Sequence, residues 1–242
     1  MERLEMVMLE IREISYTYDN AKKAALQSIS FELDRGEIVG LVGHNGAGKS
    51  TLLECISGLK WPQSGKIIIN EKEYGISFVP NDLFLYNMLT IKETLYFIGS
   101  LHSLSRIEID KVIKPLLRLF SLNSKENDYM KDLSYGMKQQ VALIIGILSK
   151  PTYFLLDEPM NGFDALSTKK TKDYLTSLAK EKEIGILLSS HRLDIIEDIC
   201  DRVVILNTGR LVYEGTVSQL KNNQTFEDAL ISVSGDKHAD NF

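Results

Sequence analysis

The sequence predicts an α/β fold with a mainly parallel sheet, an N-terminal antiparallel β subdomain and an α-helical insert. Three observations support this. Residues 153–206 alternate short apolar strands with helical stretches, which is typical of a parallel sheet covered on both faces. Residues 9–18 and 25–33 are two strand-like runs around a polar turn, as in an antiparallel hairpin. Residues 81–150 show mainly helical patterns, which predicts an inserted helical block.

The first strand of the predicted parallel sheet is the apolar run 37–42, and it leads into a glycine-rich motif. Gly43–Thr51 matches G-x-x-x-x-G-K-[ST], the phosphate-binding P-loop, and so predicts a P-loop NTPase core. Its glycines allow positive φ, so successive N–H groups can face an anion. The helix expected from about Thr51 directs its N-terminus at the same anion.

The P-loop assigns individual residues to a nucleotide. Lys49 is expected to reach the β- and γ-phosphates, and the Ser50 hydroxyl to bind Mg²⁺. The nucleotide-binding residues predicted from this stretch are Gly43, Asn45, Gly46, Ala47, Gly48, Lys49, Ser50 and Thr51.

The helical insert is predicted from its helix starts. Thr90–Glu93 and Ser105–Glu108 are capping boxes that open helices to about residues 102 and 120. Residues 121–132 are expected to form a polar connection before a third helix over 135–150.

The remaining elements are short. Strands are expected at 66–70, 75–79, 153–156, 184–189, 203–206 and 211–213, helices at 167–182, 193–200, 217–221 and 225–231, and a polar tail at 235–242.

Composition limits the function classes. The 242 residues are enough for one large domain, and 44% apolar with 25% charged residues is ordinary for a globular protein. The net charge is −5 and no basic stripe occurs, so nucleic acid is not an expected partner. The N-terminus lacks the apolar stretch of a secretory signal, and the longest apolar run, 141–148, is too short to span a membrane. Work at a membrane would therefore require docking on another protein.

Two lone cysteines, Cys55 and Cys200, fall inside predicted helices. We expect both to be buried reduced thiols, consistent with a cytoplasmic site.

Two adjacent carboxylates follow the apolar strand 153–156. Asp157 is suited to hold Mg²⁺ through water, and Glu158 to polarise an attacking water. The alternative is a solvated turn after a core strand.

Leu133–Met137 opens the third predicted helix of the insert. Ser134 is a good N-cap, and Gly136 allows close approach of a ligand, so this helix start is a second possible anion site. Taken alone, the stretch is just a capped helix, and only the other motifs give it a role in binding.

The order of these motifs resembles the nucleotide-binding domain of ABC transporters. The P-loop, Leu133–Met137, Asp157-Glu158 and His191 follow one another as in that family, and the resemblance extends over residues 9–231. It implies one ATPase domain over 1–235 that binds ATP and Mg²⁺. Within it, 1–80 and 151–235 would form the core with the β subdomain, 81–150 the helical subdomain, and 236–242 a tail.

The resemblance also implies roles across a dimer. Two domains would associate head to tail, as two copies or with a paralogous ATPase. Each ATP would then lie between one P-loop and the signature of the partner, the motif that corresponds to Leu133–Met137 in this sequence. Ser134 and Gly136 would then contact the γ-phosphate of the other chain's ATP, and residues 161–164 would be the D-loop between the two sites. His191 would contact the γ-phosphate within its own chain.

Adenine stacking is implied for an aromatic near the start of the chain. Tyr18 lies where the family places it, with Tyr16 as a rival; packing within the strand is the alternative for either.

Two departures from the family pattern affect the expected site. Asn81 stands where the family has a glutamine that contacts Mg²⁺, and one methylene less shortens the reach by about 1.5 Å. We therefore expect this contact to be lost or bridged by water. Tyr135 and Met137 replace the middle glycine and final glutamine of the signature. The principal catalytic residues are retained, so we expect an active ATPase.

The leading functional hypothesis is an ATP-hydrolysing subunit that powers export through a separate membrane permease, bound at the cytoplasmic face. The residues Ser-x-Gly-Met at 134–137, followed by Lys-Gln-Gln, resemble exporters with separate ATPase and permease chains. A non-hydrolytic regulatory subunit is the alternative that Asn81 and Tyr135 favour. A soluble ABC ATPase acting on nucleic acid or ribosomes is disfavoured, because the stretch before Ser134 is too short for the inserted arm of those proteins.

One apolar loop is a candidate permease contact. Residues 81–90 include Leu83, Phe84, Leu85, Tyr86 and Met88, and part of this surface is expected to receive a short coupling helix. The alternative is that these side chains pack the insert against the sheet. The sequence does not indicate the cargo.

Overall fold

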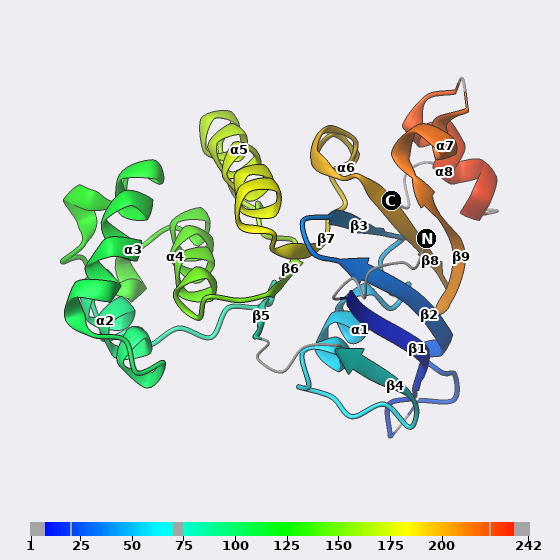
Figure 1. The fold of residues 1–242 in the computed structure, drawn as a ribbon, viewed down its shortest axis with the longest axis horizontal. Helices are drawn as coiled ribbons and strands as arrows, with labels where there is room; N and C mark the ends of the chain where they lie inside the picture. The colour runs from blue at the N-terminus through cyan, green and yellow to red at the C-terminus, as the bar shows by residue number, and fades with distance from the viewer. Residues whose placement is uncertain (1–7, 20, 70–74, 223, 235–242) are drawn as a thin grey trace, which may run out of the picture.

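The computed structural model describes residues 8–19, 21–69, 75–222 and 224–234, arranged as two sheets with surrounding helices (Figure 1). The predicted tail at 235–242 and residue 70 of a predicted strand lie outside these residues. The strands are β1 Met8–Tyr16, β2 Leu26–Asp34, β3 Ile38–Val42, β4 Ser64–Ile69, β5 Ile76–Val79, β6 Tyr153–Asp157, β7 Gly185–Ser189, β8 Arg202–Asn207 and β9 Arg210–Thr216. The α-helices are α1 Lys49–Ile56, α2 Ile91–Leu101, α3 Arg106–Leu119, α4 Tyr135–Leu148, α5 Ala165–Lys182, α6 Leu193–Ile199, α7 Val217–Lys221 and α8 Phe226–Ser234.

The larger sheet has the strand order β5-β6-β7-β3-β8-β9, parallel except for β9. Its central strands are buried on both faces. In β3, Ile38 and Val42 join one hydrophobic core, while Val39 and Leu41 join the other. Because successive side chains point to opposite faces, a strand between two cores needs apolar residues at every position. Burial of both strand faces therefore explains why these strands appear in the sequence as continuous apolar runs.

The smaller sheet has the antiparallel order β2-β1-β4 and confirms the predicted hairpin. Leu9 pairs with Leu33, and Leu9 also pairs with Ile69 on the other edge of β1. Its apolar face shares a core with α1 and one face of the larger sheet. This arrangement encloses the helix that follows the P-loop.

The helices α2, α3 and α4 form a block on one side of the larger sheet (Figure 1), which we call the helical insert, residues 81–150. Both predicted capping boxes form: Thr90 and Ser105 each accept the backbone N–H of the glutamate three residues later, and that glutamate accepts in return. The connection at 121–132 is mostly polar and exposed, as expected, and it contains two short 3₁₀ helices, Asn123–Lys125 and Met130–Asp132. Leu122 and Met130 are buried there, so two apolar side chains anchor an otherwise polar stretch to the core.

Cys55 and Cys200 are free, buried thiols, as expected. Burial raises the pKa of Cys55 to about 11 and also raises the pKa of Cys200. Among the described residues, no helix is both long and apolar enough to span a membrane.

Candidate functional site

The predicted site residues converge at one edge of the larger sheet. Asp157 pairs with Ser189, and Ser189 pairs with Leu41, so the ends of β6, β7 and β3 are level with one another. In a parallel sheet these are all carboxyl ends, where ligands of α/β folds bind. The P-loop, the Asp157-Glu158 pair and His191 therefore leave the sheet side by side, and Asn81 follows the neighbouring strand β5.

The P-loop ends where α1 begins, and α1 starts at Lys49 rather than at the expected Thr51. Gly48 is its N-cap, with φ 109°, and makes no side-chain cap to the helix. A Cβ at Gly48 would lie 2.7 Å from the Ala25 carbonyl oxygen, so the position requires glycine. The first-turn N–H groups of α1, including those of Lys49 and Ser50, are thus left for an anion.

Lys49 is buried inside the loop, with 9% of its surface exposed. Its Nζ donates to the carbonyl oxygens of Gly43 and His44, the latter at 3.3 Å. Burial lowers the pKa of Lys49, and the charges of Glu158 and Asp157 oppose that shift. The geometry thus places one amine between the P-loop backbone and the two carboxylates.

The two carboxylates are held differently. Asp157 is buried, and the Ser189 hydroxyl donates to its Oδ1 over 2.5 Å. Glu158 has φ 51°, and its N–H donates to Ser189, to the carbonyl oxygen at 3.2 Å and to Oγ at 3.1 Å. Ser189 therefore orients both residues. This role of Ser189 is not predicted from the sequence, although Ser189 lies two positions before His191 at the end of an apolar strand.

His191 contacts Glu158 directly. Its Nδ1 lies 2.8 Å from Glu158 Oε2, and because a carboxylate only accepts, the ring N–H donates. Half of the His191 side chain is exposed, while most of the Glu158 side chain is buried. An acid–base pair therefore stands at the strand ends, with its histidine facing solvent.

Asn81 does not stand free at this edge. Its Oδ1 accepts from the Tyr135 hydroxyl at 3.1 Å and from Asn161 Nδ2 at 3.2 Å, and its backbone carbonyl accepts from Tyr135 at 2.9 Å. The two residues that depart from the family pattern thus contact each other.

Ser134 and Gly136 lie at the start of α4, in the helical insert. Ser134 is the predicted N-cap, and its Oγ accepts the N–H of Met137. Gly136 packs on the loop after β6: a Cβ there would lie 2.4 Å from the Gly162 carbonyl oxygen. Asp164 ends that loop as the N-cap of α5.

Tyr18 stands beside the P-loop helix. Its hydroxyl and Thr51 Oγ1 are 2.9 Å apart, and the Lys60 ammonium lies over its ring. Tyr16 meets it edge to face but packs partly on the core, so the ring of Tyr18 is the more exposed of the two. This favours Tyr18 over Tyr16 as a flat surface for a base.

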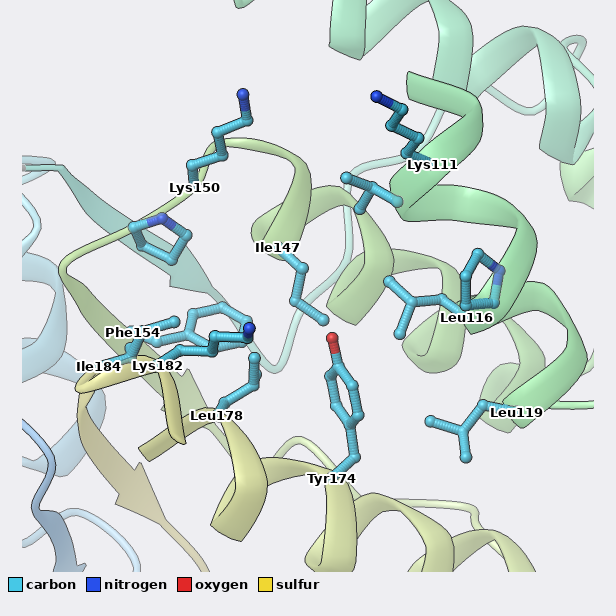
Figure 2. Close-up of a pocket in the computed structure, with 13 residues that line it drawn as sticks. Lys111, Leu116, Leu119, Ile147, Lys150, Phe154, Tyr174, Leu178, Lys182 and Ile184 are labelled. Carbon is cyan, nitrogen blue, oxygen red and sulfur yellow. The ribbon is translucent and has the colours of Figure 1, made fainter. Parts of the chain in front are cut away.

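Two cavities lie outside this edge. One of about 350 Å³ is lined by the loop 83–86 together with β5, α2 and α4. A larger one of about 720 Å³ separates α3 and α4 from α5 (Figure 2). Its lining includes Pro151 and Ile184, which precede β6 and β7, so it opens at the amino ends of the strands. It is thus on the opposite edge of the sheet from the P-loop.

Comparison with known proteins identifies the family. The family model described as ABC transporter matches residues 26–161, more than half of the chain. An uncharacterized ABC transporter ATP-binding protein of Bacillus subtilis, YthP, is 36% identical and covers 90% of this chain and 89% of its own. The chain belongs to the ABC transporter family, as an ATP-binding subunit with an ABC ATPase domain.

Other relatives agree on the family and the fold, and one of them is named as an importer. A solved structure described as the ATP binding subunit of an ABC transporter is 32% identical, with a TM-score of 0.86, and covers 94% of this chain and 99% of its own. The methionine import ATP-binding protein MetN 1 of Bacillus cereus is 31% identical, covering 89% of this chain and 67% of its own. The expected fold is confirmed, and the family alone does not fix export.

Proposed function

We propose that the chain binds Mg²⁺ and ATP, hydrolyses the ATP, and so powers export through a separate membrane permease at the cytoplasmic face. One observation carries this proposal: the P-loop lysine and the hydrogen-bonded pair of Glu158 and His191 meet at one sheet edge. A solvated Asp-Glu turn would not require Ser189 to hold the Asp157 carboxylate and the Glu158 backbone N–H, nor His191 to hold the Glu158 carboxylate.

The residues fit a magnesium ion bound with a nucleotide. Mg²⁺ prefers one or two carboxylates with a hydroxyl and phosphate oxygens, and Asp157 and Ser50 supply the protein share. No cluster of three acidic, histidine or cysteine ligands occurs among residues 8–19, 21–69, 75–222 and 224–234, so an all-protein cage is not the arrangement here. When bound, the ion would neutralise charge on the β- and γ-phosphates.

The chain's own residues divide the chemistry. The P-loop amides and Lys49 bind and orient the phosphates, and Tyr18 stacks on adenine. Glu158 takes a proton from the attacking water, and His191 orients that carboxylate through its N–H and faces the γ-phosphate. Residues 81–150 act as a helical subdomain that supplies the signature.

A second ATPase domain completes the site. Ser134 is exposed at the N-terminus of α4, and the backbone N–H groups of the first turn of this helix are suited to bind an anion. Because α4 belongs to the insert and not to the P-loop side, its natural ligand is the ATP of a second copy or paralogue. Head-to-tail pairing would bring residues 161–164 to the same interface.

Export is supported by the stretch from Ser134 to Gln140, which resembles exporters with separate chains. The permease would dock at the cavity beside the loop 83–86. There Leu83 and Leu85 pack against the core, while Phe84 and Tyr86 face outward. The packing alternative thus describes Leu83 and Leu85, and the outward-facing Phe84 and Tyr86 are the side chains that we propose contact the permease. Transport direction would be tested with the co-purified complex in vesicles, where ATP-driven uptake of cargo into inside-out vesicles indicates export.

Hydrolysis is tested by Glu158→Gln. Loss of the general base should lower phosphate release by the assembled complex about 10²–10⁴-fold, with ATP binding retained. The matched control is Glu183→Gln, at an exposed glutamate after α5, which should leave the rate unchanged. Equal rates for Glu158→Gln and the unmodified chain would refute Glu158 as the base. If the unmodified complex releases no phosphate, the alternative hypothesis of a non-hydrolytic regulatory subunit is favoured instead.

A further inference from the structure

A small polar cluster joins the insert to the turn that bears Glu158. Tyr135 Oη donates to both oxygens of Asn81, and Gln139 Nε2 donates to Tyr135 Oη over 3.1 Å. Asn161 donates to Asn81 Oδ1, and the backbone N–H of Asn161 donates to the Glu158 carbonyl oxygen over 3.2 Å. The cluster thus links α4, the end of β5 and the turn after β6.

The contact connects residues that lie 54 positions apart in the chain. The Tyr135 ring also packs on the turn, since a Cβ at Gly162 would lie 3.1 Å from Tyr135 Cδ1. Further along the junction, a cavity of about 720 Å³ lies between α5 and the helices α3 and α4 (Figure 2), while nearer the start of α4 Gln140 Nε2 donates to Ser167 Oγ of α5 over 3.2 Å. The cluster is therefore one of the contacts that position the start of α4, together with the packing of Gly136 on Gly162 and the bond from Gln140 to Ser167.

The side-chain oxygen of Asn81 can accept only a limited number of bonds, so Tyr135 and Asn161 compete for it with the nucleotide or its ion. An amide oxygen has two lone pairs, and Tyr135 and Asn161 use both. Turning that oxygen to the nucleotide or its ion requires at least one of these bonds to break. In the cluster, moreover, the buried Gln139 Oε1 has no hydrogen-bond partner among the described residues, and such a group disfavours the arrangement that buries it. Both facts leave a second arrangement accessible.

We propose that Tyr135 is a positioning residue whose hydroxyl latches Asn81 to the start of α4, and that ATP must release this latch before Asn81 can turn to the nucleotide. Tyr135 holds Ser134 and Asn81 in one arrangement. Because ATP must break this arrangement, the free energy of the latch opposes ATP binding and weakens the apparent affinity for ATP. This inference rests on the proposed function in one respect, namely that Asn81 serves the nucleotide.

Tyr135→Phe tests the latch, because it removes the hydroxyl and keeps the ring. Without nucleotide, backbone amides of residues 81–83 and 134–138 should exchange with deuterium faster than in the unmodified chain. With ATP and Mg²⁺, the KM for ATP should fall about three- to tenfold, the worth of one or two accessible hydrogen bonds, with kcat changed less than twofold. Asn81→Ala should remove most of the effect of Tyr135→Phe when the two are combined.

Tyr129→Phe is the matched control. Tyr129 is a tyrosine of the same insert, 45% exposed against 47% for Tyr135, and its hydroxyl makes no hydrogen bond within the described residues. It should change neither exchange nor KM. Unchanged exchange in Tyr135→Phe overturns the latch, and so does an unchanged KM in an active chain. If no variant hydrolyses ATP, the proposed function fails, while the exchange measured without nucleotide still decides the latch.

Discussion

At the scale of the residue, the P-loop works through backbone conformation more than through side chains. Gly46 has φ 82°, and a Cβ added there would meet no atom of the described residues within 4 Å. Glycine is therefore needed at this position for its φ and not for space. The left-handed conformation is what turns successive N–H groups toward one anion.

Gly46→Ala should weaken ATP binding roughly tenfold or more. The added Cβ disfavours this conformation by about 1–2 kcal/mol, and relaxation would turn the N–H away from the phosphates. Binding is measured by titration calorimetry with ATP and Mg²⁺.

Gly58→Ala is a matched control for this prediction. Gly58 has φ 81°, is equally uncrowded and follows α1 outside the P-loop. Both variants should lose similar thermal stability, but only Gly46→Ala should lose affinity. Equal affinities in the two would show that the loop tolerates alanine.

At the scale of the element, the loop between β5 and α2 combines a packing role with an exposed aromatic surface. Phe84 is 89% exposed, and its ring meets that of Tyr86, which in turn meets that of Phe97, both edge to face. A row of three aromatic rings beside a cavity suits an apolar helix of a partner. Phe84 is thus the most accessible residue for testing the permease contact.

Phe84→Glu should release the permease on co-purification, because docking would bury the new charge without a partner. ATP binding should be unchanged, since the loop is separate from the P-loop. The control Ile107→Glu places the same charge at an exposed apolar residue of the insert, 70% exposed, that does not line this cavity. Retention of the permease by Phe84→Glu, at the level of the control, would contradict this docking site.

At the scale of the whole molecule, stability should depend on acidic pH. Hydrogen bonds from the cap residues lower the pKa of Glu93 and Glu108, and the pKa values of three aspartates are lowered through their side-chain or backbone partners. These aspartates are Asp110, Asp164 and Asp194. A carboxyl whose pKa is lower in the folded chain stabilises that chain above its ordinary pKa, near 4. The contribution is lost as pH falls through the folded value.

The temperature of the thermal unfolding midpoint should therefore decrease as the pH is lowered from 6 to 3.5. Because the backbone N–H groups of Thr90 and Ser105 are the largest cause of the lowered pKa values of Glu93 and Glu108, and alanine would keep those donors, the test removes the carboxyls: a Glu93→Gln and Glu108→Gln double variant should show a weaker pH dependence in this range. Scanning calorimetry at several pH values measures both. A midpoint that stays constant down to pH 3.5 would contradict the lowered pKa values.

The sequence by itself determined the motifs and most elements of this protein. Helix caps, apolar strands and the P-loop depend on residues within a few positions of one another, so a local pattern is sufficient to predict them. For the same reason, the sequence predicted the main site residues one by one before their arrangement was known, namely Lys49, Asp157, Glu158 and His191. The stretch 121–132 is the polar connection that was expected, but its two short 3₁₀ helices and their buried anchors, Leu122 and Met130, were not predicted, because two apolar side chains are a weak signal in a polar stretch.

Only the tertiary structure decided which residues meet. Ser189 orients Asp157 and Glu158 because β7 lies beside β6 in register, and strand order does not follow from strand composition. Tyr135 and Asn81 were two separate departures in the sequence and became one contact when the insert packed beside the sheet. Such long-range pairs depend on how whole elements are placed, which no short pattern of residues encodes.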